Sequence, residues 1–277
     1  MIRYSVIVPY RGEPELLQRA LASVPEREDV ELLAVEDAEG RGAGWARNRA
    51  LENAQGAWLV FLDSDDFFLP GAFDAMDKHA EGEEDLVFFD ITSVYSDSLK
   101  PSARHRTRSG MLARYASNPS QVQFYGRYLY NEPWGKMIRR SLVEDKGIRF
   151  DETLCANDFT FSVLCGHWAD KVCYDPTPVY CVTEREGSVS SRYFDSPQKT
   201  LDRLKVYWKV QRFFDKENIP LEPFYGLWMM CKNEGGETLR VAREFCARES
   251  ISAWQLWQGC AKRILKKRLR WCVPYNA

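Results

Sequence analysis

The first 95 residues alternate short apolar runs with segments whose apolar residues recur at helical spacing. The apolar runs predict strands at 4–8, 30–35, 58–62 and 85–91. The helical spacing predicts helices at 15–24, 43–54 and 71–80. We expect the first strand to stop at Pro9, the second to be buried, and Trp45 to point inward from its helix. Strands that alternate with helices form a mostly parallel sheet covered on both faces, so the sequence predicts an α/β fold.

The rest of the chain divides into three stretches. Residues 96–125 are polar and contain a basic string at 104–108, which predicts a loop or lid. Residues 128–182 mix aromatic-rich strands with a helix at about 157–168. Beyond Ser196 the apolar spacing predicts helices at 198–214, 224–230, 237–246 and about 252–271. We therefore expect a domain at 1–195 and a mainly helical C-terminal extension at 196–277.

Composition excludes several classes of protein. With 277 residues, the chain can form one large domain or a domain with an appendage. Its formal net charge of −2 disfavours a general nucleic-acid binder, which is usually basic. None of the eight cysteines belongs to a CxxC pair, which disfavours zinc and indicates free thiols in a reducing cytoplasm. Since we find neither a secretory signal nor an apolar run of about 18 residues, we expect a cytoplasmic protein without a membrane span.

Acidic residues follow the predicted strands where those strands end. Asp37 follows the second strand, and Asp63, Asp65 and Asp66 follow the third in VFLDSDDFF (60–68). Ligands of open parallel sheets bind beyond the carboxyl ends of the strands, so these carboxylates should gather at one edge. A hard divalent cation, Mg²⁺ or Mn²⁺, would relieve their repulsion while it binds substrate phosphates. The segment at 63–66 is therefore a predicted metal site, and a solvated turn that caps the next helix is the alternative.

Seven segments resemble, in order, the inverting family 2 glycosyltransferases, and more closely the bacterial enzymes that build capsular and other surface polysaccharides. They are SVIVPY (5–10), ELLAVED (31–37), ARNRALENAQGAWLVFLDSDDFFLPGAF (46–73), WGKMIRRSL (134–142), GIRFDE (147–152), NDFTF (157–161) and REGSVS (185–190). Residues 195–277 carry no such motif. The resemblance implies a GT-A fold at 1–195, which is a Rossmann-like, mixed but mostly parallel sheet that binds a nucleoside diphosphate sugar.

The resemblance also implies nucleotide-binding residues. Asp37 matches the carboxylate that accepts a hydrogen bond from the base, often uracil, and Pro9 matches a main-chain contact to the base or ribose. Arg47 matches a residue suited to the nucleotide or its phosphates, which arginine can bind in a bidentate manner. Asp65 and Asp66 match the pair that binds the metal and the sugar diphosphate, and Asp63 opens the DxD motif. The chain departs from the family around the base, where Glu-Asp-Ala-Glu at 36–39 replaces Asp-Asp-Gly-Ser.

Asp158 in NDFTF matches the catalytic base, although Asn157 replaces the glutamate that usually precedes it. A carboxylate within hydrogen-bond reach can remove the proton of an acceptor hydroxyl as that hydroxyl attacks the anomeric carbon. The metal would neutralise charge on the departing diphosphate, and one in-line displacement would invert the anomeric centre. The alternative for Asp158 is a carboxylate stabilised at a helix N-terminus.

Five other positions have less specific expectations. Trp134 and Lys136 of WGKM either face the acceptor or brace the sheet. Arg185 opens REGSVS, where relatives place a loop over the diphosphate, so a phosphate contact and a solvated surface position both stay open. His79, like His167, has no metal-ligand partner at useful sequence spacing, which predicts a core or surface role.

The stretch KRILKKRLRW (262–271) has six basic residues and no acidic one. On a helix its apolar residues fall broadly to one side and its cations to the other. Such a helix can lie on an anionic membrane surface, where each cation adds roughly 1 kcal/mol of attraction. We expect either peripheral contact with the inner face of the plasma membrane or a helix packed on the protein with solvated charges.

These features predict a metal-dependent, inverting glycosyltransferase of surface polysaccharide biosynthesis. It would move a sugar from a nucleoside diphosphate donor, with UDP expected, to a saccharide or a lipid-linked saccharide. A GT-A-fold nucleotidyltransferase is one alternative, but its Gly-rich loop is missing at 11–14. A catalytically inactive nucleotide-sugar-binding module is the other, and the intact acidic residues argue against it.

Overall fold

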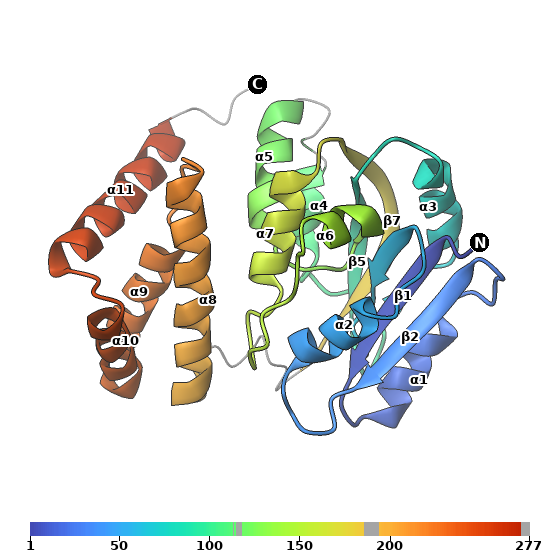
Figure 1. Ribbon diagram of the computed structural model, residues 1–277, viewed down its shortest axis with the longest axis horizontal. Helices are drawn as coiled ribbons and strands as arrows, with labels where there is room; N and C mark the ends of the chain where they lie inside the picture. Colours follow the sequence, from blue (N-terminus) through green and yellow to red (C-terminus); the bar gives the residue numbers. More distant parts are fainter. Residues whose placement is uncertain (113, 115–117, 186–193, 273–277) are drawn as a thin grey trace. The chain divides into compact units, whose positions relative to one another are not determined.

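The computed structural model describes residues 1–112, 114, 118–185 and 194–272. The chain forms two compact units, one at 1–191 and one at 192–277 (Figure 1). A seven-stranded mixed sheet of order β2-β1-β3-β6-β5-β7-β4 forms the centre of the first unit. Its strands are β1 (Tyr4–Tyr10), β2 (Val30–Glu36), β3 (Trp58–Phe61), β4 (Phe67–Phe68), β5 (Leu86–Tyr95), β6 (Lys136–Arg139) and β7 (Val172–Glu184).

The pairing of the strands gives the sheet one chemically distinct edge. β1 is parallel to β2 and β3, and β5 is parallel to β7. β6 lies antiparallel between β3 and β5, and β4 is antiparallel to β7. Consequently β1, β2, β3, β5 and β7 all run in the same direction, and their carboxyl ends share an edge. The predicted α/β fold with a mixed sheet is confirmed.

Helices cover both faces of this sheet. They are α1 (Pro14–Ala22), α2 (Ala43–Leu51), α3 (Ala72–Ala80), α4 (Arg106–Leu112), α5 (Pro119–Leu129), α6 (Arg140–Asp145) and α7 (Phe159–Trp168). Successive residues of β7 show the two faces, since side chains alternate along a strand. The Tyr174 hydroxyl donates to the Val122 carbonyl of α5, whereas Asp175 contacts His79 of α3. Large aromatic side chains fill the core, and Phe61 packs edge-on against Phe161.

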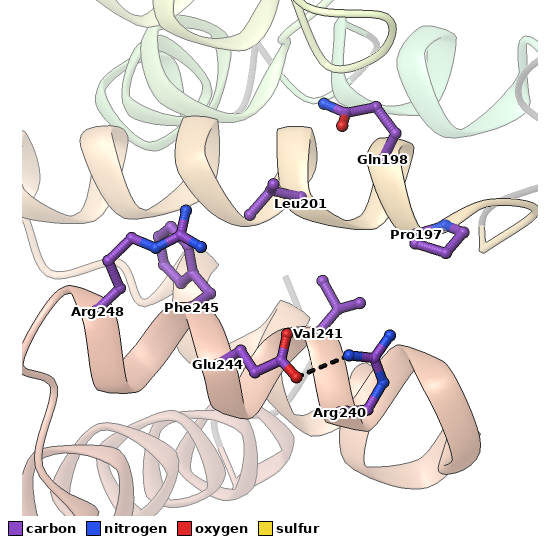
Figure 2. A pocket seen from close by; sticks show the side chains of 8 residues that line it. All are labelled: Pro197, Gln198, Leu201, Arg240, Val241, Glu244, Phe245 and Arg248. Atoms are coloured by element: carbon purple, nitrogen blue, oxygen red, sulfur yellow. Dashed lines mark hydrogen bonds and ion pairs between the residues drawn. The ribbon is translucent and has the colours of Figure 1, made fainter.

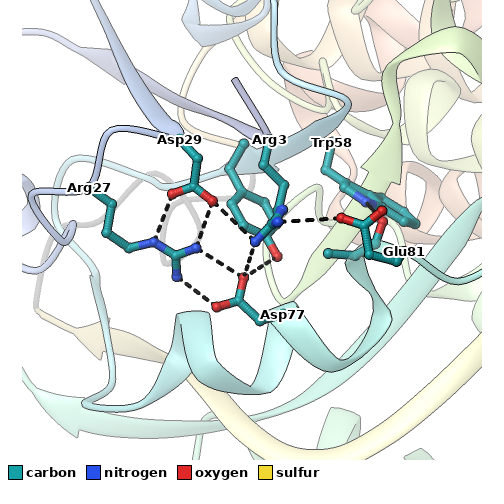
Figure 3. A network of polar contacts seen from close by, with 8 residues as sticks. Arg3, Arg27, Asp29, Trp58, Asp77 and Glu81 are labelled. Atoms are coloured by element: carbon teal, nitrogen blue, oxygen red, sulfur yellow. Dashed lines mark hydrogen bonds and ion pairs between the residues drawn. The ribbon is translucent and has the colours of Figure 1, made fainter. Parts of the chain in front are cut away.

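Charged side chains connect α3 to the amino end of β1 (Figure 3). The Arg27 guanidinium donates to both Asp29 and Asp77, and the Tyr4 hydroxyl donates to Asp77 over 2.9 Å. Arg3 adds an ion pair to Asp77. The paired guanidinium groups keep the pKa of Asp77 below its ordinary value, although burial alone would raise it. This network fixes the position of α3 against the sheet.

Three local predictions about the first 50 residues are wrong. β1 continues through Pro9, because β3 ends opposite Ile7 and leaves Pro9 paired with β2 alone, so a missing donor is tolerated. β2 is an edge strand rather than a buried one, and its Leu32 is 42% exposed. Trp45 is only half-buried, whereas the neighbouring polar residues Arg47 and Asn48 point into the protein.

The prediction of a loop or lid at 96–125 is also wrong, since α4 and α5 occupy much of this stretch. The basic string does not simply face solvent. Arg108 of α4 donates to the Leu129 carbonyl and forms a 2.6 Å ion pair with Glu132. These partners lie more than twenty residues away in sequence, so local polarity could not indicate that the segment is folded.

The second unit is helical, as predicted. Its helices are α8 (Pro197–Lys216), α9 (Pro223–Glu234), α10 (Gly236–Arg248) and α11 (Ala253–Cys272). They surround a separate core to which Leu204, Phe224 and Phe245 contribute. Figure 2 shows a pocket between α8 and α10, bordered by the 2.7 Å ion pair of Arg240 and Glu244. Among the described helices, none combines the length and apolar character that a membrane span requires.

Candidate active site

The carboxyl edge of the sheet collects the charged residues predicted to form the site. Asp63 follows β3 by two residues, and its amide donates to the Tyr180 hydroxyl of β7 over 3.1 Å. Arg185 directly follows β7 and forms a 2.7 Å ion pair with Glu13, which lies beyond β1. The Arg185 Nε lies 3.8 Å from a carboxylate oxygen of Asp65. The remaining residues of REGSVS, 186–190, lie outside the described part of the chain.

The carboxylates of the acidic segment have different surroundings. Asp66 is buried, and its carboxylate accepts hydrogen bonds from the Tyr180 hydroxyl (2.8 Å) and the Thr183 amide (2.6 Å). The Asp65 carboxylate instead lies near Asp63 and Arg185. Burial and the Asp63 charge raise the pKa of Asp65, while burial and both neighbouring carboxylates raise that of Asp66 further. A cation bound beside Asp65 would therefore offset its repulsion from Asp63.

Arg47 connects the acidic segment to the residues around α7. It is buried in α2, and its guanidinium donates to Asp63 Oδ1 (2.6 Å) and Asn157 Oδ1 (2.9 Å). It also lies over the Phe150 ring, 5.2 Å from the ring centroid. A planar guanidinium can bind two acceptors at fixed angles, which an ammonium cannot do. Arg47 thereby joins Asp63 to Asn157, a residue that lies 110 positions after Arg47 itself in the sequence.

Asp158 lies at the N-cap of α7, and its side chain makes no capping hydrogen bond. Burial raises its pKa from 3.8 to about 6, and the charges of Glu132 and Asp63 act in the same direction. The Arg47 guanidinium opposes that shift. A carboxylate with a pKa near 6 is ionised at neutral pH and is also more basic than an ordinary aspartate, as a general base requires.

Lys136 and Trp134 lie inside the protein. Lys136 donates to the Tyr130 carbonyl over 2.6 Å, and its ammonium lies 4.4 Å from the Tyr130 ring centroid. Burial lowers the pKa of Lys136 to about 7. Trp134 stacks on Tyr180 with ring centroids 5.2 Å apart. Of the two roles considered from sequence, these contacts correspond to bracing the sheet.

Sequence reasoning missed two charged residues near the catalytic candidate. Glu132 and Arg108 form an ion pair and interact electrostatically with the groups around Asp158. Glu132 lies two residues before Trp134, so its proximity to the WGKM segment was a usable signal. No comparable signal indicated Arg108, because the basic string at 104–108 resembles a solvated surface.

Asp37 orders the loop that leads into α2. Its carboxylate accepts hydrogen bonds from the amides of Arg41 (2.7 Å) and Gly42 (2.8 Å). Gly42 has φ +100°, and a Cβ there would lie 2.3 Å from the Thr153 carbonyl oxygen, so only glycine fits. Pro9 is buried in β1, whose carboxyl end is joined to Asp37 by the hydrogen bond from the Asp37 amide to the Tyr10 carbonyl.

Two sets of residues could hold a metal ion. At the carboxyl edge, Asp65 and Asp63 supply the hard oxygen donors that Mg²⁺ and Mn²⁺ prefer, whereas both oxygens of Asp66 already accept hydrogen bonds. Elsewhere in the described chain, His79, Glu84 and Cys173 bring three ligand atoms within 4.8 Å of one another. His79, which has no metal-ligand partner at useful sequence spacing, thus has two candidate partners in three dimensions.

Comparisons with known proteins identify the family. The family model "Glycosyl transferase family 2" matches residues 35–147. The chain is 28% identical to "Putative glycosyltransferase EpsH" of Bacillus subtilis over 193 residues, covering 67% of this chain and 54% of that protein. It is 30% identical to "Succinoglycan biosynthesis protein ExoO" of Rhizobium meliloti over 179 residues, covering 61% and 49%. The chain thus spans about half the length of these curated relatives.

Solved structures share the fold. TarS 1–349 of Staphylococcus aureus in complex with UDP-GlcNAc aligns with a TM-score of 0.56 at 20% identity, covering 82% of this chain and 80% of that one. The mannosyltransferase PcManGT of Pyrobaculum calidifontis, in complex with GDP-Man and Mn²⁺, aligns with a TM-score of 0.52 at 14% identity, covering 96% and 88%. The matched segment, residues 35–147, therefore belongs to glycosyltransferase family 2, and the sheet around it has a GT-A-type fold.

Proposed function

We propose that this protein is a metal-dependent, inverting glycosyltransferase that uses a nucleoside diphosphate sugar, with UDP as the preferred nucleotide. The acceptor would be a saccharide or lipid-linked saccharide in surface polysaccharide assembly. One observation carries the proposal: Arg47 links the acidic edge, through Asp63, to the segment that holds a carboxylate of raised pKa, Asp158. The donor complexes of TarS and PcManGT and the name of ExoO support the class of substrate.

In this proposal Asp158 is the general base. Its carboxylate accepts the proton of the acceptor hydroxyl as that oxygen attacks the anomeric carbon, and the bond to the departing diphosphate breaks on the opposite side. Arg47 positions Asp63 and Asn157, and so fixes the acidic edge relative to the base. A bound Mg²⁺ or Mn²⁺ would supply positive charge at the leaving diphosphate. Asp65, with Asp63 beside it, would hold that ion.

Other residues at the carboxyl edge have proposed roles in donor binding. Asp66 mainly orders the acidic segment, because Tyr180 and Thr183 each donate to one of its carboxylate oxygens. Each oxygen keeps a second lone pair, so Asp66 is proposed as a secondary metal ligand beside Asp65 and Asp63. Arg185 contacts a phosphate, because its Nε is buried without a hydrogen-bond partner and lies beside Asp65. Asp37 and Pro9 shape the base site at the loop before α2.

The experiment is a donor-sugar assay that measures release of nucleoside diphosphate from UDP-, GDP- and CDP-sugars, with Mn²⁺ or with EDTA. We expect release with UDP-sugars and Mn²⁺, its loss with EDTA, and its loss in Asp158→Asn with donor binding retained. Asp74→Asn, an exposed carboxylate of α3, is the matched control and should stay active. Binding without release would instead indicate an inactive module, and pyrophosphate formed from a nucleoside triphosphate would indicate a nucleotidyltransferase.

We also propose peripheral attachment to the inner face of the plasma membrane through α11. Trp254 and Trp257 on this helix are 62% and 61% exposed, with stacked rings 4.9 Å apart, and Leu265 is 58% exposed. Indole rings favour the membrane–water interface, and the basic stretch at 262–271 would add electrostatic attraction. The side chains of residues 266–272 lie outside the described part of the chain.

Liposome co-sedimentation at low salt tests this attachment. Replacing both tryptophans of the exposed pair by alanine should reduce binding to anionic vesicles, while Trp168→Ala, which changes an exposed tryptophan of the first unit, should not. Equal binding of the double variant and the unmodified chain would reject the role of α11.

A further inference from the structure

A second group of metal-ligating side chains lies at the amino ends of β5 and β7, the edge opposite to Asp63. His79 belongs to the last turn of α3, Glu84 lies in the loop before β5, and Cys173 is the second residue of β7. One ligand atom from each lies within 4.8 Å of the other two, and His79 Nδ1 is 3.9 Å from Glu84 Oε1. None of these residues takes part in the proposed transfer reaction.

Asp175 fixes the orientation of the imidazole. Its Oδ2 lies 3.0 Å from His79 Nε2, and it follows Cys173 by two residues, on the same face of β7. An ionised carboxylate only accepts hydrogen bonds, so Nε2 of a neutral His79 carries the proton. The lone pair then lies on Nδ1, the atom 3.9 Å from Glu84 Oε1. A carboxylate behind the ligating histidine is the usual support of a protein metal site.

The carboxylate of Glu84 is incompletely satisfied. Its Oε2 is buried and has no hydrogen-bond partner among the described residues, which is a costly state for a charged group. The neighbouring cation Lys171 pairs with Glu83 instead. Arg139 donates to the main-chain carbonyl of Glu84 over 3.0 Å, so the loop is held in place, while the charge of Lys171 acts on the Glu84 carboxylate without pairing with it.

We propose that His79, Glu84 and Cys173 bind a Zn²⁺ ion, with Asp175 as the positioning residue and water as the fourth ligand. Imidazole and thiolate favour Zn²⁺ over Mg²⁺ or Mn²⁺, and one thiolate with one carboxylate balances the charge of the ion. Tetrahedral zinc places one sulfur, one nitrogen and one oxygen ligand about 3.3–3.6 Å apart, so the side chains must close by up to about 1.5 Å. The cysteine thiol loses one proton to solvent when the ion binds.

The proposed ligands are far apart in the sequence, which explains why the spacing of the cysteines disfavoured a zinc site. The three ligands are 94 residues apart at their extremes in the numbering of the chain, and parallel pairing of β5 with β7 brings them together. In place of a CxxC pair, the site takes one ligand each from a helix, a loop and a strand. A bound ion would therefore cross-link α3 to the amino edge of the sheet.

Cobalt substitution tests the proposal on the full chain after EDTA treatment and removal of the chelator. Adding Co²⁺ should produce one equivalent of a tetrahedral spectrum with a thiolate-to-cobalt charge-transfer band, and Zn²⁺ should abolish it. The hard carboxylates at the opposite edge give no thiolate band, so the result is independent of the glycosyltransferase proposal. An imidazolium held between Glu84 and Asp175 is the rival state, and it predicts no band at all.

Variants locate the site. Cys173→Ser should remove the charge-transfer band, and Asp175→Asn should weaken Zn²⁺ binding by about 10–100-fold, as loss of a supporting carboxylate does elsewhere. Cys260→Ser, which changes a half-buried cysteine of the second unit, is the matched control and should bind normally. A band that persists in Cys173→Ser, or a chain without any band, overturns the proposal. Thermal unfolding of each metal-free variant establishes that it is folded.

Discussion

Replacing Asp158 by asparagine should stabilise the protein at neutral pH while it abolishes sugar transfer. The folded protein raises the pKa of this carboxyl group from 3.8 to about 6. An acid whose pKa is raised by folding is ionised more easily in the unfolded chain. Its contribution to stability is therefore lost as the pH rises from about 4 to 6, and it stays lost at higher pH. Asparagine has nearly the same shape and never ionises, so the variant escapes this loss.

The size of the effect follows from the shift. A pKa difference of roughly 2 units corresponds to about 3 kcal/mol of unfolding free energy above pH 7. This is an upper limit, because the Asp158 side chain keeps partial contact with water. The same linkage gives about half of that value at pH 5 and close to zero below about pH 4. The variant should thus gain stability over the unmodified protein as the pH rises.

Urea unfolding measures the prediction, at pH 7.5 and pH 5, in EDTA and without nucleotide. The Asp74→Asn control removes an exposed carboxylate and should show no comparable pH-dependent gain. Nucleoside diphosphate release from a UDP-sugar is measured on the same samples. An Asp158→Asn protein that is no more stable at pH 7.5 than at pH 5, relative to the unmodified chain, would refute the assignment of a disfavoured charge. Retained turnover would place the base elsewhere.

Three further predictions concern the same edge. The transfer rate should fall about tenfold per pH unit below pH 6, because protonated Asp158 cannot accept a proton; a pH–rate profile at saturating donor measures this. Arg47→Lys should lower the unfolding free energy by about 1–3 kcal/mol in urea, since lysine lacks the second nitrogen with which arginine reaches both partners. Arg49→Lys at an exposed ion pair should change little. Asp65→Asn should remove the Mn²⁺ dependence of nucleotide binding in calorimetry, whereas Asp66→Asn should mainly reduce stability.

The order of strands and helices could be predicted because the apolar residues of each element recur at the spacing of a strand or of a helix. The ends of β2 and β3 could be located to within a residue or so, and with them the positions of Asp37 and Asp63 at the carboxyl edge. Adjacent acids after an apolar run are a local signal. The edge that they share then follows from the parallel topology, without knowledge of any side-chain contact.

The partners of those residues could not be read in the same way. The bond from Arg47 to Asn157 and the position of Glu132 near Asp158 depend on which helices pack beside α2 and α7. The two helices at 106–129 were missed because their polar surface gives no clear period. His79 and Cys173 illustrate the same limit, since their proximity is created only by the pairing of distant strands.

Arg47 explains how a carboxylate of raised pKa could serve as the proposed base at neutral pH. Burial and two nearby carboxylates, Glu132 and Asp63, oppose the ionisation of Asp158, and without a counter-charge its pKa would lie higher still. The guanidinium lowers that pKa while it binds Asp63, so it reduces the repulsion from two sides. A single buried cation therefore sets both the geometry of the acidic edge and the basicity of the group that faces it.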